Sequence, residues 1–478
     1  MTEKVLIIGG GPAGMAAAHA ALAGGAEVTL LEAGDALGGQ FWRHLPEARS
    51  GAAEHRLHHK WELFHELQRE LLENPSCEVV LGAHVWSVER PEGSAAPAVH
   101  VMVGPADGTD REPRTYRPDH LVLATGGQER TLPFPGWDLP GVFTAGAAQA
   151  LAKGERVAVG RRVLVAGAGP FLLPVVTSLI HTGATVVGVA EASGWRTLGR
   201  GWLSKPWELA ATRSKAGELT GYVSALARHR VPYHAATTVV AAHGQEQVEA
   251  VTLARLDADW NPVPGTERRV EVDAVCVSHG FVARTELALS IGCAVGESGF
   301  VQTDPEQRTS VAGVFCVGEL TGIGGVDLAL AEGEIAGTVA AGGEPDPAVV
   351  RSRNDFRAFA DRLQAAHGIR PGWQSWPDPE TTLCRCEDVT VGQVRDVAAA
   401  TQARGLRSLK LTTRVGLGPC QGRTCGRNAE EILAAAAGPE GLLESGRTAN
   451  RPIAVPVRLG ELASSQNSQN HSHREEHP

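Results

Sequence analysis

Four of the eight cysteines form two close pairs in the last quarter of the chain. One residue separates Cys384 from Cys386, and four residues separate Cys420 from Cys425. Four thiolates can hold either a [2Fe–2S] cluster or a structural zinc ion. Zinc pairs are more often spaced by two residues, so the spacing favours the cluster and keeps zinc as the alternative. We therefore expect these four cysteines to be metal ligands in a one-electron carrier.

A glycine-rich turn near the N-terminus could bind a dinucleotide. The segment from Gly9 to Gly14 fits the pattern G-x-G-x-x-G and lies between an apolar strand at 5–8 and an alanine-rich helix that extends to about residue 23. In this context the glycines permit a tight turn and close approach to a pyrophosphate, and the helix N-terminus attracts the phosphates. Glu32 ends the next strand, where its carboxylate can accept hydrogen bonds from ribose hydroxyls and would repel a 2′-phosphate. The expected contacts of this nucleotide are Gly9, Gly11, Pro12, Ala13, Gly14 and Glu32.

A second turn of the same kind follows the strand at 163–166. Gly167 and Gly169 supply the first two glycines of the pattern, but Leu172 replaces the third and should push the helix away from the strand. Glu191 closes the next strand, where it could hold an adenosine ribose and would disfavour NADP. We expect an NAD-type adenine nucleotide at Gly167, Gly169 and Glu191, with a purely structural βαβ unit as the alternative.

These two turns belong to a duplicated strand–helix–strand unit, which indicates how the chain is organised. A length of 478 residues exceeds what one hydrophobic core usually supports, so we expect two or three domains. After residue 345 the pattern becomes helical, and the last residues are too polar to order themselves. The predicted parts are an FAD-type first domain at 1–130 and 290–345, a second nucleotide-binding domain of the NAD type at 131–289, a helical cluster-binding domain at 346–460, and a disordered tail at 461–478.

Two later segments indicate which dinucleotide the first domain binds. The strand at 121–124 ends in Thr125 and Gly126, and the segment 308–310 leads to a strand that ends in Gly318 and Glu319. These segments resemble the FAD-binding half of the two-dinucleotide-binding-domain flavoproteins. The resemblance implies an α/β, glutathione-reductase-like fold, with FAD contacts at Gly39, Gln40, Thr125, Gly126, Gly318 and Glu319, the last replacing the more usual Asp. Because the chain has no cysteine pair near Gly39 and no C-x-x-C in the second domain, we do not expect disulfide reduction.

The segment from Cys384 to Cys425 resembles the bacterioferritin-associated-ferredoxin-like [2Fe–2S] domain. With both nucleotide domains, the whole chain resembles the flavoprotein subunits of opine oxidase (its A subunit), of hydrogen cyanide synthase, and of heteromeric proline and D-hydroxyproline dehydrogenases (their alpha subunits). This resemblance implies an FAD-dependent oxidoreductase for CH–NH or CH–NH2 donors that works in a hetero-oligomer. A second flavoprotein subunit would oxidise the amine, and this chain would relay electrons through the cluster to an acceptor. An extra flavin such as FMN could also bind at a subunit interface.

Composition excludes some partners. The net charge of −10 argues against nucleic acid, which requires a basic face. The first strand starts at residue 5, which leaves no room for a signal peptide, and no apolar run is long enough for a membrane span, so we expect a cytoplasmic protein. Two other functions stay open: a self-sufficient NADH-dependent FAD/iron–sulfur reductase, and a non-catalytic structural subunit with zinc at the cysteines. The sequence assigns no catalytic residue.

Overall fold

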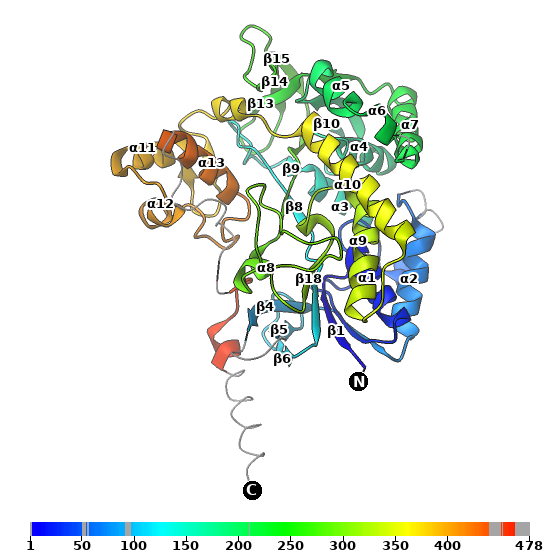
Figure 1. Ribbon diagram of the computed structural model, residues 1–478. Coiled ribbons are helices and arrows are strands. Elements are labelled where there is room, and N and C mark those ends of the chain that lie inside the picture. The colour runs from blue at the N-terminus through cyan, green and yellow to red at the C-terminus, as the bar shows by residue number, and fades with distance from the viewer. Residues whose placement is uncertain are drawn as a thin grey trace.

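The computed structural model describes residues 2–49, 54, 57–90, 97–209, 211–438, 451 and 453–463. Within these ranges the chain forms two nucleotide-type α/β domains and a smaller helical module at one side (Figure 1). No helix in the described ranges is long and apolar enough to cross a membrane. The two sheets and the short ribbon that joins them position the candidate site.

The first domain is built on a parallel sheet with the strand order β18-β7-β1-β2-β3. Its central strands are apolar and buried, as is typical of a parallel sheet covered on both faces. Helices α1, α2 and α9 cover one face, and the antiparallel meander β4-β5-β6 covers the other. The elements are β1 (Lys4–Ile8), α1 (Pro12–Ala23), β2 (Glu27–Leu31), α2 (Trp61–Glu73), β3 (Cys77–Val80), β4 (Ala83–Glu89), β5 (Ala98–Val103), β6 (Glu112–Tyr116), β7 (His120–Leu123), α8 (Glu286–Ser290), β18 (Val314–Cys316) and α9 (Gly325–Ala340), with a 3₁₀ turn at Glu47–Arg49 and another at Gly318–Leu320.

Small residues let α1 and α9 lie very close together. A Cβ added at Gly333 would lie 2.2 Å from the carbonyl oxygen of Ala13, and one at Gly337 would lie 2.1 Å from that of Ala17. No larger residue fits at either position without moving a helix, because real Cβ atoms do not approach so closely. This contact fixes the start of α1, and therefore the glycine-rich turn that precedes it.

The second domain repeats the arrangement with the parallel strand order β12-β11-β10-β16-β9 and a meander β13-β14-β15. Its strands β10 and β16 are almost wholly buried, as expected for central parallel strands. The elements are β9 (Val142–Thr144), α3 (Ala145–Gly154), β10 (Arg162–Gly167), α4 (Leu172–His181), β11 (Thr185–Glu191), α5 (Trp195–Leu203), α6 (Pro206–Leu209), α7 (Arg213–Arg228), β12 (Tyr233–Ala235), β13 (Thr237–His243), β14 (Ala250–Arg255), β15 (Arg268–Glu271) and β16 (Ala274–Ser278).

A two-stranded antiparallel ribbon joins the two domains. The chain leaves the first domain through β8 (Gly127–Glu129) and returns through β17 (Phe281–Ala283). Gln128 pairs with Val282, and Glu129 pairs with Phe281. Side chains alternate between the two faces of such a ribbon, so neighbouring residues point to different surroundings.

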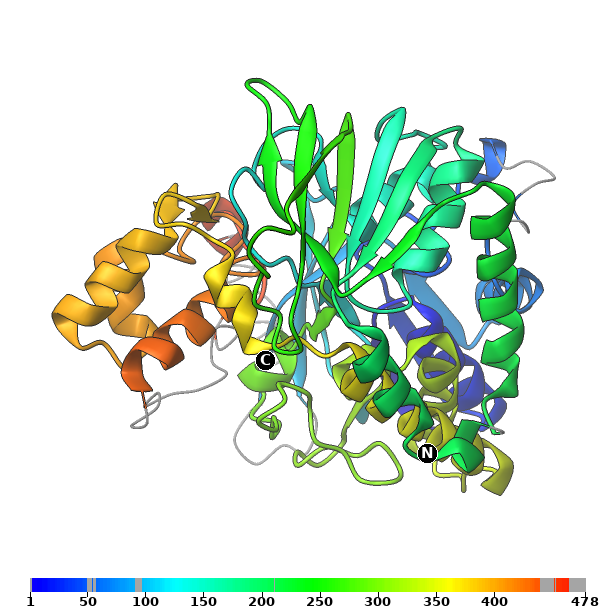
Figure 2. The ribbon, with the colours of Figure 1, turned by 90° about the horizontal axis from the view of Figure 1, so that it is seen from above.

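The helical module follows α10 (Pro347–His367), which packs against α9 and α5 (Figure 1). A 3₁₀ turn at Pro371–Ser375 leads into the module, where Trp373 and Trp376 share an apolar core with Trp260 of the second domain. Both Figure 1 and Figure 2 show the module to one side of the two α/β domains. Its elements are β19 (Thr382–Cys384), β20 (Val389–Thr390), α11 (Val391–Thr401), α12 (Leu406–Thr413) and α13 (Gly426–Ala437).

The segment after the module returns to the first domain. The Ala454 N–H donates to the carbonyl of Trp86 at 2.8 Å. The Nε and Nη2 atoms of Arg111 donate to the two carboxylate oxygens of Glu461, at 2.7 and 2.6 Å. Both side chains are almost fully buried. Glu461 is the first residue of the predicted disordered tail, whose residues 464–478 lie outside the described ranges.

Candidate functional site

The turn between β1 and α1 has the geometry that the glycine pattern predicts. Gly9 has a positive φ of 112°, and a Cβ there would lie 2.3 Å from the carbonyl oxygen of Ala124. A Cβ on Gly14 would lie 1.8 Å from the carbonyl oxygen of Gly9. At Gly11, by contrast, the nearest atom would be 3.9 Å away, so this glycine leaves open space beside the turn. Gly9 and Gly14 therefore shape the turn, and Gly11 provides the approach for a ligand.

Glu32 holds this turn from the end of β2. The backbone N–H of Gly10 donates to its Oε2 at 2.7 Å, and the N–H of Gly34 donates to its Oε1 at 2.7 Å. Each carboxylate oxygen can accept more than one hydrogen bond, so ribose hydroxyls can still bind here. Glu32 thus supports the turn and faces the space where the predicted ribose lies.

One large cavity brings the predicted FAD contacts together. Its volume is about 2470 Å³, well above the roughly 300–1,000 Å³ of an ordinary ligand pocket. Of the predicted contacts only Gly14 does not line it, because Gly14 packs against the turn itself. The lining contacts are Gly9, Gly11, Pro12, Ala13, Glu32, Gly39, Gln40, Thr125, Gly126, Gly318 and Glu319. These residues come from five separate stretches of sequence and fit an extended dinucleotide such as FAD.

Two carboxyl groups lie beside the turn at Gly318. Glu319 lines the cavity deep inside the protein, and burial raises its pKa. Glu332 on α9, which the motifs do not single out, accepts from the Gly318 N–H at 2.9 Å and from the Thr321 hydroxyl at 2.6 Å. Arg357 on α10 donates to the other oxygen of Glu332. Glu332 therefore holds the turn, and Glu319 is left to face the ligand.

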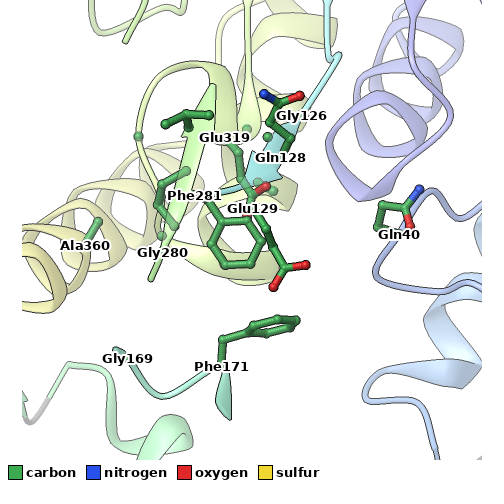
Figure 3. A pocket seen from close by; sticks show the side chains of 18 of the residues that line it. Gln40, Gly126, Gln128, Glu129, Gly169, Phe171, Gly280, Phe281, Glu319 and Ala360 are labelled. Atoms are coloured by element: carbon green, nitrogen blue, oxygen red, sulfur yellow. The ribbon is translucent and has the colours of Figure 1, made fainter. Parts of the chain in front are cut away.

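The second glycine turn is only partly open. A Cβ on Gly167 would lie 1.7 Å from the carbonyl oxygen of Ser278, so this glycine is needed for strand packing. Gly169 lines the same large cavity as the FAD contacts, together with Phe171 (Figure 3). Neither Gly167 nor Glu191 lines it.

Glu191 is completely buried by its neighbours. Its two oxygens accept from the N–H groups of Gly169 and Ser193 at 3.0 and 2.9 Å. The ring of His367, at the end of α10, lies 3.4 Å from its Oε2, and Trp202 donates to the other ring nitrogen at 3.2 Å. In this structure the carboxylate therefore presents no surface to a ribose.

Two buried ionisable side chains that no motif signals also line the cavity. Glu129 on β8 accepts from the Gly146 N–H at 2.7 Å, and burial raises its pKa. Lys153 on α3 donates to the carbonyl of Phe41 at 3.1 Å, and burial lowers its pKa to about 8. Figure 3 shows the Glu129 carboxylate turned toward Phe171, with Gln40 on the other side of the open space. No local sequence pattern surrounds either residue, and only the folded chain places both on the cavity.

In the structure each cysteine of the first sequence pair contacts one cysteine of the second pair. The thiol of Cys425 hydrogen-bonds to Cys384 and lowers the pKa of Cys384 to about 6, and the thiols of Cys386 and Cys420 hydrogen-bond to each other. Cys384 and Cys425 are buried, whereas Cys386 is exposed. In the described part of the chain no group of three or more His, Cys, Asp or Glu side chains is placed to hold a single metal ion. Two thiols for each of two irons is the arrangement that a [2Fe–2S] cluster needs.

Family comparison agrees with this geometry. A model of the pyridine nucleotide-disulphide oxidoreductase family matches residues 3–341, which is most of the chain. The chain belongs to this family. A model of the BFD-like [2Fe-2S] binding domain matches residues 382–435 and spans all four paired cysteines.

Similar proteins extend over nearly the full length. The A subunit of opine oxidase from Agrobacterium tumefaciens (strain Ach5) is 31% identical, over 96% of this chain and 91% of its own. Hydrogen cyanide synthase subunit HcnB of Pseudomonas protegens is 29% identical, over 89% of this chain and 90% of its own. The crystal structure of L-proline dehydrogenase from P. horikoshii shares the fold, with a TM-score of 0.64 and 22% identity over 97% of this chain and 79% of that one.

These findings confirm several predictions from the sequence. The chain is an oxidoreductase with the two-dinucleotide-binding-domain fold, an FAD site and a C-terminal [2Fe–2S] domain. The predicted resemblance to the flavoprotein subunits of opine oxidase and hydrogen cyanide synthase is also confirmed. The roles of individual contact residues, the domain boundaries and the NAD at the second turn stay predictions.

We expect Gly14→Ala to abolish tight FAD binding, since the added methyl group overlaps the Gly9 carbonyl. The affinity for FAD should fall at least tenfold, which is about 1.4 kcal/mol or more. Flavin titration of the FAD-depleted protein measures this loss. The matched control is Gly217→Ala in α7, where nothing lies within 4 Å of the added Cβ and which should keep full FAD binding. Equal FAD affinity in both variants would contradict this account of the turn.

Lys153→Met should stabilise the protein below pH 8 and lose this advantage at higher pH. In the folded protein the pKa of Lys153 is about 8, below its ordinary 10.5, so the buried ammonium costs stability at neutral pH. As the pH rises from about 8 to 10.5, the folded wild-type protein gives up this proton and the cost disappears. At pH 7 the gain in the free energy of unfolding should be at most about 3 kcal/mol. Denaturant titrations of both proteins across this pH range measure it. The exposed Lys205 provides the control, since Lys205→Met should show no such pH-dependent gain.

Proposed function

We propose that this chain is the electron-relaying, alpha-type subunit of a heteromeric flavin-dependent dehydrogenase or oxidase for amines or imino acids. The observation that carries the proposal is that the flavin cavity and the cysteine module share a wall. Arg423, between Cys420 and Cys425, lines the cavity, as do Arg427 and Glu431 of α13. FAD and the cluster would lie on two sides of one layer of protein, which suits transfer between a two-electron and a one-electron carrier.

The names of similar proteins support the donor class. Opine oxidase and L-proline dehydrogenase are named for donors that contain a C–N bond. We carry over to this chain a CH–NH or CH–NH2 donor, such as an opine, proline or a hydroxyproline-like compound. Oxidation to the C=N product removes two electrons and two protons. The electron pair would reach the FAD and leave one electron at a time through the cluster, toward an external acceptor.

The same names support a partner. Two of the most similar proteins are named as subunits, which indicates that they work with other chains. In the proposed complex a second flavoprotein subunit oxidises the amine, and this chain receives the electrons. The partner and the acceptor are defined here only by that chemistry.

The closed surroundings of Glu191 favour this proposal over an NADH-dependent reductase. A dinucleotide bound in the usual way needs the acid at the end of the second strand to face its ribose. Here Glu191 is completely buried, and the ring of His367 covers it. NADH is therefore a poor candidate for the electron source.

Anaerobic purification should yield roughly one FAD, two irons and two sulfides per chain. Adding NADH should leave the flavin spectrum unchanged, whereas dithionite should bleach the flavin and reduce the cluster. Absorption spectra with iron, sulfide and zinc analysis of the same sample make both measurements. Rapid bleaching by NADH would support the reductase instead, and zinc without sulfide would support a structural subunit.

The isolated chain should not oxidise proline or an opine with an artificial electron acceptor. The complex with its flavoprotein partner should do so, because the proposed site of C–N oxidation lies on that partner. Steady-state assays at equal FAD content compare the isolated chain with the complex. Full amine dehydrogenase activity from the isolated chain would overturn the proposal that it works only as one component of a larger enzyme.

A further inference from the structure

The ribbon β8–β17 forms part of the wall between the cavity and the cysteine module, beside module residues such as Arg423 that line the cavity directly. Glu129 and Phe281 are paired across the ribbon, and both point into the cavity, toward Phe171 (Figure 3). Arg130, which directly follows β8, reaches the module and donates to Asn428 of α13. Gln128, Glu129 and Arg130 all line the cavity, and Gln128 and Arg130 also hydrogen-bond to the module.

Gln128 lies in this wall and contacts both the cavity and the cysteine module. It lines the cavity, and its Nε2 donates to the carbonyl oxygen of Arg423 at 2.7 Å. Because a backbone carbonyl can only accept, the amide nitrogen of Gln128 must face it. The Arg423 N–H in turn donates to the carbonyl of Cys420 at 3.1 Å. Two hydrogen bonds thus connect a cavity-lining side chain to the main chain of a predicted cluster ligand.

We propose that Gln128 is a positioning residue that provides the electron path from the flavin to the cluster, through Arg423 and Cys420. This inference rests on the relay function proposed above. With both groups bound, the reduced flavin would supply its two electrons to the cluster one at a time, its protons would leave to solvent, and the cluster would pass each electron to an external acceptor before it takes the next. The electron pair itself comes from the amine donor through the partner subunit.

Other contacts across the wall are less direct. The Arg130 guanidinium donates to the side chains of Asn428 and Glu431 on α13 and lies 6.0 Å from the ring centroid of Trp373. A route through Arg130 must then follow the main chain from Asn428 back to Cys425. The Gln128 hydrogen bond instead ends on the cysteine loop itself, at Arg423, whose own side chain also lines the cavity.

The first test is Gln128→Met, which keeps the length of the side chain but removes its N–H donor. In the full-length holoprotein, a photochemical pulse under anaerobic conditions reduces the flavin, and absorption and EPR follow the cluster. We expect electron transfer to the cluster to be slowed several-fold, with FAD content, iron content and both midpoint potentials as in the wild type. The control is Asp138→Ala, which removes another 2.7 Å hydrogen bond between the second domain and the module, that from Thr382, and should keep the wild-type rate.

A second variant covers the case in which Gln128→Met loses FAD. In Gln128→Glu the ionised carboxylate cannot donate to the Arg423 carbonyl, but the neutral acid can. Electron transfer in this variant should therefore be slow at high pH. As the pH falls and the acid becomes protonated, the rate should approach that of the wild-type protein measured at the same pH. A merely structural role would not produce this pH profile.

The outcomes separate this inference from the proposed function. A wild-type rate in Gln128→Met, or in Gln128→Glu at every pH, overturns the Gln128 path and leaves the relay in place. An equal loss of rate in Asp138→Ala also overturns the Gln128 path, since any weakening of the contact between the second domain and the module would then explain the slower electron transfer. If reduced flavin never reduces the cluster in the wild-type protein, the relay itself fails.

Discussion

At the carboxyl edge of the first sheet the backbone leaves no room for a side chain at Gly9 or Gly14, and the position of the flavin cavity depends on that contact. The same tight packing continues where α1 meets Gly333 and Gly337 of α9. Because α9 follows the turn at Gly318 and Glu319, these close backbone approaches fix two neighbouring turns that line the cavity. Each glycine loses more conformational entropy on folding than another residue would, but only glycine allows the backbone to approach so closely at these positions.

The cysteine module acquires its orientation from a different kind of contact. An apolar core around Trp260, Trp373 and Trp376 attaches it to the second domain, and hydrogen bonds from the ribbon attach it to the cavity wall. The parallel-sheet domain thus supplies a rigid surface, and the module supplies the thiols. Neither part alone creates the shared wall on which the proposed relay depends.

The sequence predicts those features that local patterns encode. The glycine turns, Glu32 and the cysteine pairs are each recognised within a few residues, and the structure places most of the predicted FAD contacts on one cavity. The features that could not be predicted depend on long-range packing. Gln128 and Arg423 are 295 positions apart, and nothing near Glu191 in the sequence indicates that His367 would cover it. Lys153 and Glu332 belong to the same class, because only the folded chain brings them to the cavity or its turns.

The return of the chain to the first domain through Glu461 and Arg111 has a mechanical consequence. Before the module, the stacked rings of Trp260 and Trp376 attach the chain to the second domain. Beyond the module, the buried ion pair of Arg111 and Glu461, with two hydrogen bonds, attaches the chain to the first domain. Attachment on both sides disfavours large movements of the module relative to the two α/β domains. A redox partner of the proposed relay would reach the cysteines most directly at the exposed Cys386.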